Sequence, residues 1–163
     1  MIEFYPFSKF YKYKLNVSED EKNQVKIIMK DKFTTYNQLN ILNVPTLKYL
    51  RKQITDILDK HGLLLNNNFA QRYNKLDYHG VHVHPNSRYS GILYLSSGGT
   101  PTVFYDSWFE SYEQPVEKDT LLLFPSYIPH EVRFLTEDED RLVISFNTDM
   151  NPSFRASVDQ HRD

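Results

Sequence analysis

Three histidines stand in the sequence where they could hold a metal ion. His82 and His84 belong to the run "GVHVHP", and side chains at positions i and i+2 of a β-strand point to the same face. His130 comes much later, after the apolar run "TLLLFP" and a turn that contains two prolines. Imidazole suits first-row divalent metals, and three ligands on one face leave coordination positions open for substrate and oxygen. The pattern therefore predicts a metal site formed by His82, His84 and His130.

Each of these histidines also has a purely structural interpretation. His82 and His84 would be ordinary polar residues if they lay on a solvent-facing side of the strand. His130 would then be a hydrogen-bonding residue of the turn. His79 lies beside Gly80, and we expect it in a turn or at the rim of a pocket, with replacement of one metal ligand as the alternative.

Arg141 is a further candidate for a functional residue. It begins the run "RLVISFN", after the acidic turn "TEDED", and strand alternation places it on one face with Val143 and Ser145. If that face is the inner one, the buried guanidinium needs an anionic partner. A ligand carboxylate beside the metal would provide one, since guanidinium and carboxylate pair bidentately. The alternative is an ion pair with an acidic residue of the turn.

The elements that must position these residues fall into two groups. Ser18 and Glu21 make a capping box and predict a helix over about 19–31. Pro45, an apolar period of 3.6 residues and Gly62 predict a second helix. After Gly62 the period changes to two, in seven or eight short apolar runs separated by turn residues. We therefore expect a mainly β (α+β) protein with a β-sandwich or jelly-roll core and two N-terminal helices packed outside.

The domain organisation follows from this division. The 163 residues suffice for one domain. We expect helical N-terminal support over 1–65, the β core over 66–150 and a frayed tail over 151–163. The aromatic stretch 104–115 is expected to cover the barrel, or alternatively to form a lid or a platform for substrate.

Composition excludes several classes of function. The chain has no cysteine, which excludes disulfides, thiolate nucleophiles and cysteine-based zinc sites. Its net charge of −2 gives no reason to expect a nucleic-acid partner. No apolar run approaches the roughly 20 residues of a membrane span. The N-terminal residues lack the apolar core of a secretory signal, so we expect a cytoplasmic protein.

The run from 71 to 147 resembles the iron(II)/2-oxoglutarate-dependent oxygenases. The likeness is greatest to the prolyl-hydroxylase-like branch and to a group of small bacterial and phage proteins. Five segments stand in the family's order: "QRYNKLDYHGVHVH", "SGILYL", "GGTPTVFYD", "PVEKDTLLLFPSYIPHEV" and "RLVISFN". The first holds the histidine pair, the fourth the distal histidine and the last the arginine that binds the cosubstrate. The match covers about half of the chain.

This resemblance implies a double-stranded β-helix in which the histidine pair and His130 hold Fe(II). It implies that 2-oxoglutarate chelates the metal and sets its distal carboxylate against Arg141. Tyr94 and Tyr73 match family tyrosines that hydrogen-bond the cosubstrate, and Ser145 is expected to support the same carboxylate. The implied reaction consumes O2, converts 2-oxoglutarate to succinate and CO2, and hydroxylates an unidentified peptide, protein or small molecule.

One departure from the family pattern concerns the metal ligands. The family's pair is His-x-Asp or His-x-Glu, whereas this chain has His82-x-His84. Three neutral imidazoles leave the site one negative charge poorer, so we expect weaker binding of Fe(II). A carboxylate such as Asp77 or Asp106 is a candidate for an additional ligand.

Two other functions remain open from the sequence. The first is a cupin-type metalloprotein with three histidines and other dioxygenase or isomerase chemistry. Against it, the glutamate that a cupin places after its histidine pair is replaced here by Arg88 and Tyr89. The second is a non-catalytic jelly-roll binding module whose histidines are surface residues.

Overall fold

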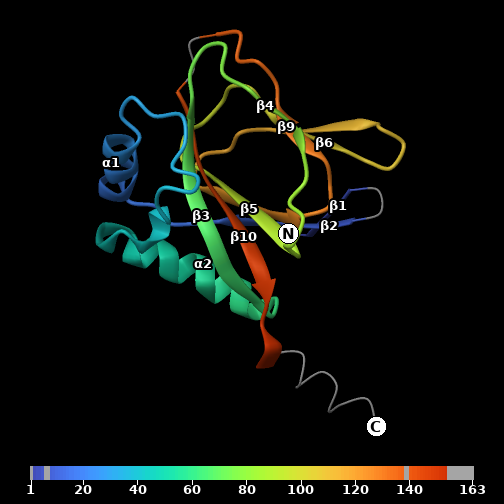
Figure 1. The fold of residues 1–163 in the computed structure, drawn as a ribbon, viewed down its shortest axis with the longest axis horizontal. Helices are drawn as coiled ribbons and strands as arrows, with labels where there is room; N and C mark the ends of the chain where they lie inside the picture. The colour runs from blue at the N-terminus through green and yellow to red at the C-terminus, as the bar shows by residue number, and fades with distance from the viewer. Residues whose placement is uncertain (1, 6–7, 138–139, 154–163) are drawn as a thin grey trace.

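The strands of this protein form two antiparallel sheets, shown in Figure 1. The structure is a computed structural model that describes residues 2–5, 8–137 and 140–153. The larger sheet has the order β1 (Ile2–Tyr5), β2 (Ser8–Lys14), β8 (Thr120–Pro125), β5 (Tyr89–Tyr94), β10 (Arg141–Met150), β3 (Leu63–Tyr73). The smaller sheet has the order β4 (His79–His82), β9 (His130–Val132), β6 (Thr102–Tyr105), β7 (Ser111–Gln114). The mainly β class predicted from the periodicity is confirmed.

Two helices pack on the outer face of the larger sheet (Figure 1). They are α1 (Glu19–Ile28) and α2 (Lys48–Lys60), and two short 3₁₀ turns, η1 (Ile41–Asn43) and η2 (Pro45–Leu47), lie between them. Leu50 and Ile54 of α2 share one apolar cluster with Leu93 and Ile144 of the sheet. Both helices were predicted from sequence, although α1 ends at Ile28 rather than near residue 31.

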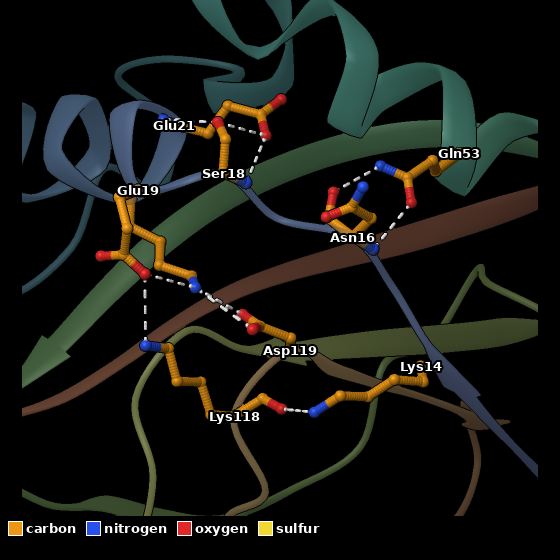
Figure 2. A network of polar contacts seen from close by, with 9 residues as sticks. Lys14, Asn16, Ser18, Glu19, Glu21, Gln53, Lys118 and Asp119 are labelled. Carbon is orange, nitrogen blue, oxygen red and sulfur yellow. Dashed lines mark hydrogen bonds and ion pairs between the residues drawn. The ribbon is translucent and has the colours of Figure 1, made fainter.

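The carboxylate of Glu21 ties the beginnings of the two helices together, and Figure 2 shows its contacts with Ser18. The predicted capping box is present: Glu21 N donates to Ser18 Oγ at 3.2 Å, and Ser18 N donates to Glu21 Oε2 at 3.0 Å. The other oxygen of Glu21 accepts from the backbone N of Leu50 in α2 at 3.0 Å. Nearby, Lys22 Nζ lies 3.1 Å from the carboxylate of Asp119, which joins α1 to the loop before β8. These contacts anchor the helical layer on the sheet.

The N-terminal segment differs from the prediction. Residues 1–65 were expected to contribute helical support, yet β1 and β2 extend the larger sheet at its edge. β2 pairs with β8 through Tyr11 opposite Leu123, and Phe10 is buried between the sheets. The run "SKFYKYK" has the alternation of aromatic and polar residues that a half-buried strand requires. The strand pattern is therefore present in the sequence before the first helix.

The aromatic stretch 104–115 also differs from the prediction. It forms a hairpin, because Ser111–Gln114 makes the unpredicted strand β7 and pairs with β6. Phe104 is buried as expected of a residue that covers the barrel. Trp108 and Phe109, at the tip, are 77% and 83% exposed, so the tip does not cover the core.

The core between the two sheets is the part of the fold that surrounds the candidate site. It contains Phe104 of β6, Phe124 of β8 and Val143 of β10. No helix within the described part of the chain is long and apolar enough to cross a membrane. Most of the predicted tail, 154–163, lies outside the described residues.

Candidate metal centre

The ring nitrogens of His82, His84 and His130 converge on one point. One nitrogen of each ring lies within 4.8 Å of the other two, and His84 Nε2 is 3.2 Å from His130 Nε2. Metal–nitrogen bonds of about 2.1 Å that meet near a right angle place two ligand nitrogens about 3 Å apart. The separation between His84 and His130 therefore suits two ligands of one cation.

Strand pairing brings these distant residues together. β4 and β9 are antiparallel neighbours, and His82 stands opposite His130 in their register. β4 ends at His82, so His84 lies just beyond the strand rather than within it. The backbone N of His84 donates to Ser126 O at 2.9 Å, which holds the chain beside the turn that leads to His130.

Backbone carbonyls orient two of the three rings. His82 Nδ1 donates to Gly80 O at 2.7 Å, and His130 Nδ1 donates to Ile128 O at 2.9 Å. Because a carbonyl oxygen only accepts, each Nδ1 carries the proton and each Nε2 keeps its lone pair. Metal-binding histidines are usually held in this way by a partner of the second nitrogen.

Burial keeps the three imidazoles neutral. His130 is only 4% exposed, and its ring packs against those of Phe104 and Phe124. Its burial lowers its pKa well below the usual value, and the neighbouring His82 lowers it further. Burial also lowers the pKa of His82, and it lowers that of His84 to about 4. All three rings therefore offer lone pairs at neutral pH.

No carboxylate of the described residues joins this cluster. The two aspartates considered from sequence serve as hydrogen-bond acceptors in turns. Asp77 Oδ2 accepts from Asn74 N at 2.7 Å. Asp106 Oδ1 accepts from the backbone N of Trp108 and of Glu110 at 2.8 and 2.9 Å. The donor set in the described part of the chain is therefore three neutral imidazoles.

Arg141 is 2% exposed and is held by hydrogen bonds and ring contacts, without a countercharge among the described residues. Its Nη2 donates to Thr102 Oγ1 at 2.8 Å, and its Nε donates to Thr100 O at 3.2 Å. The guanidinium carbon also lies 4.8 Å from the ring centre of Tyr73 and 5.6 Å from that of Tyr94. No aspartate or glutamate among the described residues forms an ion pair with it.

The acidic turn before Arg141 has a different partner. Asp140 pairs with Arg72 at 2.7 Å, on the neighbouring strand β3. Residues 138 and 139 lie outside the described part of the chain. The ion pair with Arg141 that the sequence left open is therefore not made by Asp140.

One cavity joins the histidine cluster to Arg141. It has an empty volume of about 420 Å³, including its open mouth, and it lies between the two sheets. Arg141, Val143 and Ser145 all line it, as the alternation along the strand predicted. Ser145 Oγ donates to Gln71 Oε1 at 3.4 Å, so the hydroxyl is oriented by the neighbouring strand. The cavity thus has three neutral imidazoles that could hold a metal ion in one part of its wall and a buried cation in another.

The two tyrosines expected near a cosubstrate occupy different places. Tyr73 lines the cavity, and burial raises its pKa to about 12, so its phenol keeps its proton. Tyr94 is fully buried, is not among the described lining residues, and shares a 2.8 Å hydrogen bond with Thr102. Tyr94 therefore supports Arg141 from behind, through its ring and through Thr102.

Sequence reasoning missed two polar residues of the cavity wall, Gln71 and Thr102, whereas His79, expected in a turn or at the rim of a pocket, lines the cavity. His79 stacks on His82 with ring centres 3.9 Å apart, and its Nδ1 lies 3.3 Å from Gln71 Nε2. Burial, then His82 and Arg141, lower the pKa of His79 to about 4. Gln71 alternates with Tyr73, and Thr102 with Phe104, so strand periodicity was the signal that could have identified them.

Comparison with solved structures identifies the fold. A prolyl hydroxylase from Trichoplax adhaerens, in complex with a peptide fragment of hypoxia inducible factor, aligns with a TM-score of 0.65 and 14% identity over 91% of this chain and 86% of that one. HygX from Streptomyces hygroscopicus, with nickel and 2-oxoglutarate bound, aligns with a TM-score of 0.63 and 13% identity over 88% of this chain and 82% of that one.

A third structure, an oxidoreductase of the 2OG-Fe(II) oxygenase family from Burkholderia pseudomallei, has a TM-score of 0.56 and 16% identity over 65% of this chain. This chain spans 59% of the length of that protein. No family model and no curated protein matches the sequence. At these identities the comparisons show the fold: a jelly roll similar to that of 2-oxoglutarate-dependent oxygenases, as the sequence resemblance predicted.

Proposed function

We propose that this protein is an Fe(II)- and 2-oxoglutarate-dependent dioxygenase that hydroxylates a second substrate and forms succinate and CO2. The observation that carries the proposal is the buried guanidinium of Arg141, which lacks a described countercharge and lines the same cavity as the three histidines. A buried charge without a partner is costly. A ligand with one carboxylate near the metal and a second at Arg141 would offset that cost. The likeness in fold to known 2-oxoglutarate oxygenases supports this choice.

The side chains present fit both the metal and the cosubstrate. His82, His84 and His130 would hold Fe(II), which when bound supplies the redox chemistry that couples O2 to 2-oxoglutarate and to a C–H bond. Fe(II) and the Arg141 guanidinium carry three positive charges, and a dianionic cosubstrate supplies two negative ones, so three neutral imidazoles leave the filled cavity with one net positive charge. A dianion is therefore favoured over a monoanionic or uncharged ligand, because it offsets more of the buried positive charge.

The residues around Arg141 would prepare it for a carboxylate. Thr100 and Thr102 each accept from one of its N–H groups, which fixes the plane of the guanidinium. A guanidinium has five N–H donors, so donors remain for a bidentate bond. The tyrosine rings on which it packs exclude water and stabilise the cation.

The test measures metal, cosubstrate and product separately. Metal analysis of the purified protein should find one transition-metal ion per chain or show that one Fe(II) can be added. Anaerobic addition of 2-oxoglutarate to the Fe(II) form should produce a charge-transfer absorption band in the visible region. In air the same mixture should form succinate. The proposal is wrong if Fe(II) binds but 2-oxoglutarate produces no band and no succinate.

A second function is favoured by one specific observation. The cluster contains three histidines and no described carboxylate, which is the donor set of a cupin-type metalloprotein that does not use 2-oxoglutarate. Such a protein has no need of a buried arginine in the cavity. Stoichiometric metal binding that is indifferent to 2-oxoglutarate would favour this second function.

A further inference from the structure

An open groove adjoins the cavity that contains the three histidines and Arg141, which we call the metal cavity. It has an empty volume of about 1000 Å³, including the open solvent at its mouth, and His79, His82 and His84 line both the groove and the metal cavity. Arg141 lines only the cavity. If the proposed function is correct, the cosubstrate occupies the cavity. The groove is then where the primary substrate approaches the metal.

The described lining of the groove contains three histidines but no other acidic or basic side chain. None of its twelve described lining residues is Asp, Glu, Lys or Arg, although a quarter of the chain is charged and about three would be expected. A charged group placed away from the histidines would lose water and gain no partner of opposite charge among the described lining residues, which is unfavourable. The groove therefore selects against ionised substrates.

The wall of the groove combines aromatic faces with side-chain amides. Phe33 and Tyr36 are partly exposed and present their rings at its edge. Asn86 and Asn147 supply amides. Asn147 Nδ2 donates to Asn67 Oδ1 at 2.9 Å, so this part of the wall is held in place by its own hydrogen bonds.

A second groove continues the first. The two share Tyr36 and Phe69, whose rings meet edge to face with centres 4.9 Å apart. The second groove has an empty volume of about 520 Å³ and also lacks charged residues among its described lining. Its wall contains five side-chain amides: Asn37, Gln38, Asn40, Asn67 and Asn68. The amide oxygens of the last three already accept hydrogen bonds from within the chain. The side chains of Asn37 and Gln38 make no hydrogen bond to the rest of the described chain, so both can bind a ligand.

These two grooves define the chemistry of a ligand. An amide offers both a donor and an acceptor, and so does a hydroxyl group, so the amide groups that are left free match the hydroxyl groups of a ligand. The electron-rich face of an aromatic ring suits the C–H face of a saturated ring. We propose that the primary substrate is an uncharged, hydroxyl-rich small molecule, such as a neutral glycoside, which lies along both grooves with one end at the metal. The reaction of this substrate depends on the proposed function, whereas its binding along the two grooves does not.

Binding can be tested without iron, 2-oxoglutarate or O2. The full chain loaded with Zn(II) would be titrated with three matched probes: phenyl β-D-glucopyranoside, the corresponding glucuronide and the corresponding glucosaminide. Saturation-transfer NMR gives a Kd for each. We expect the neutral probe to bind about tenfold more tightly than either charged one. A peptide of four uncharged residues, blocked at both ends, is the fourth probe and should bind less tightly than the glucoside.

Two variants locate the binding site. Tyr36→Ala removes a half-exposed ring that lines both grooves and should weaken binding of the neutral probe about fivefold. Tyr49→Ala removes a more exposed ring of α2 that lines neither groove, and it should leave the Kd unchanged. Equal or tighter binding of a charged probe or the peptide, no binding of the glucoside at millimolar concentration, or indifference to Tyr36→Ala would each overturn the proposal. A failed succinate assay with intact glucoside binding would reject the oxygenase reaction alone.

Discussion

Replacement of Arg141 by methionine separates a role in binding from a role in folding. The proposed pair with a 2-oxoglutarate carboxylate consists of two charge-assisted hydrogen bonds in a cavity where the guanidinium is 2% exposed. Hydrogen bonds to charged groups contribute about 1.5–3 kcal/mol each, so the loss should be about 3–4 kcal/mol after some repacking. The Kd for 2-oxoglutarate should therefore rise by roughly 150- to 1000-fold. Metal content should not change, because Arg141 is not a ligand.

The same substitution should have little effect on the stability of the protein without cosubstrate, or increase it. Without a carboxylate the guanidinium is buried with no described countercharge, and apolar side chains often replace such groups at no cost. Methionine has a similar length and can pack against the rings of Tyr73 and Tyr94. Thr102 would keep its 2.8 Å hydrogen bond to Tyr94, so its hydroxyl is not left without a partner.

Two measurements decide the outcome. Anaerobic titration of the charge-transfer band gives the Kd for 2-oxoglutarate, and thermal unfolding of the metal-loaded protein gives Tm. Arg72→Met is the matched control: Arg72 lies on the adjacent strand β3 and pairs with Asp140, so its loss should leave the Kd unchanged. An unchanged Kd in Arg141→Met would refute the assignment of the carboxylate site. A large fall in Tm with an unchanged Kd would make Arg141 a structural residue.

Four other outcomes are expected. His130→Ala should abolish metal binding, because it removes the most buried ligand, whereas His61→Ala at the end of α2 should bind metal normally; metal analysis of both variants compares them. His84→Asp should retain Fe(II) or bind it more tightly, because a carboxylate adds negative charge; a metal-free variant would show that the His84 ring has another role. Glu21→Ala should lower stability by about 2–3 kcal/mol and Tm by roughly 4–12 °C, because one carboxylate caps both helices, and unchanged thermal unfolding would contradict this. In the metal-free protein, burial lowers the pKa of His79 and of His84 to about 4. As the pH falls, these two side chains therefore take up protons in the unfolded chain before they do so in the folded protein. Stability should therefore decrease from pH 6.5 towards 4, and a constant Tm over that range would exclude this linkage.

Much of the secondary structure follows from local pattern. The capping box at Ser18 and the apolar period before Gly62 predicted both helices, because caps and periodicity act between residues close in sequence. The change to a period of two predicted the β core. The strands missed were β1, β2 and β7. β1 and β7 are edge strands of four residues, which is too short a run to show a period of two clearly, and they pair in local hairpins with β2 and β6. β2 also pairs with the distant strand β8, and that pairing is not visible in a local run.

In the candidate site, too, the sequence predicts some features and only the tertiary structure establishes the others. His82, His84, His130 and Arg141 are visible in the sequence because their residue types and strand phase suggest metal and carboxylate binding. Their convergence depends on the antiparallel register between β4 and β9, which only the tertiary structure establishes.

The sequence by itself determined the types of side chain and the face of the strand on which each stands, because both follow from the order of residues. The tertiary structure decided that no described carboxylate reaches the histidines and that Arg141 has no described countercharge. It also decided that loops near Tyr36 and Asn86 border uncharged grooves beside the metal site. These properties depend on which distant segments meet, and the packing of the two sheets and the loop before η1 sets those contacts.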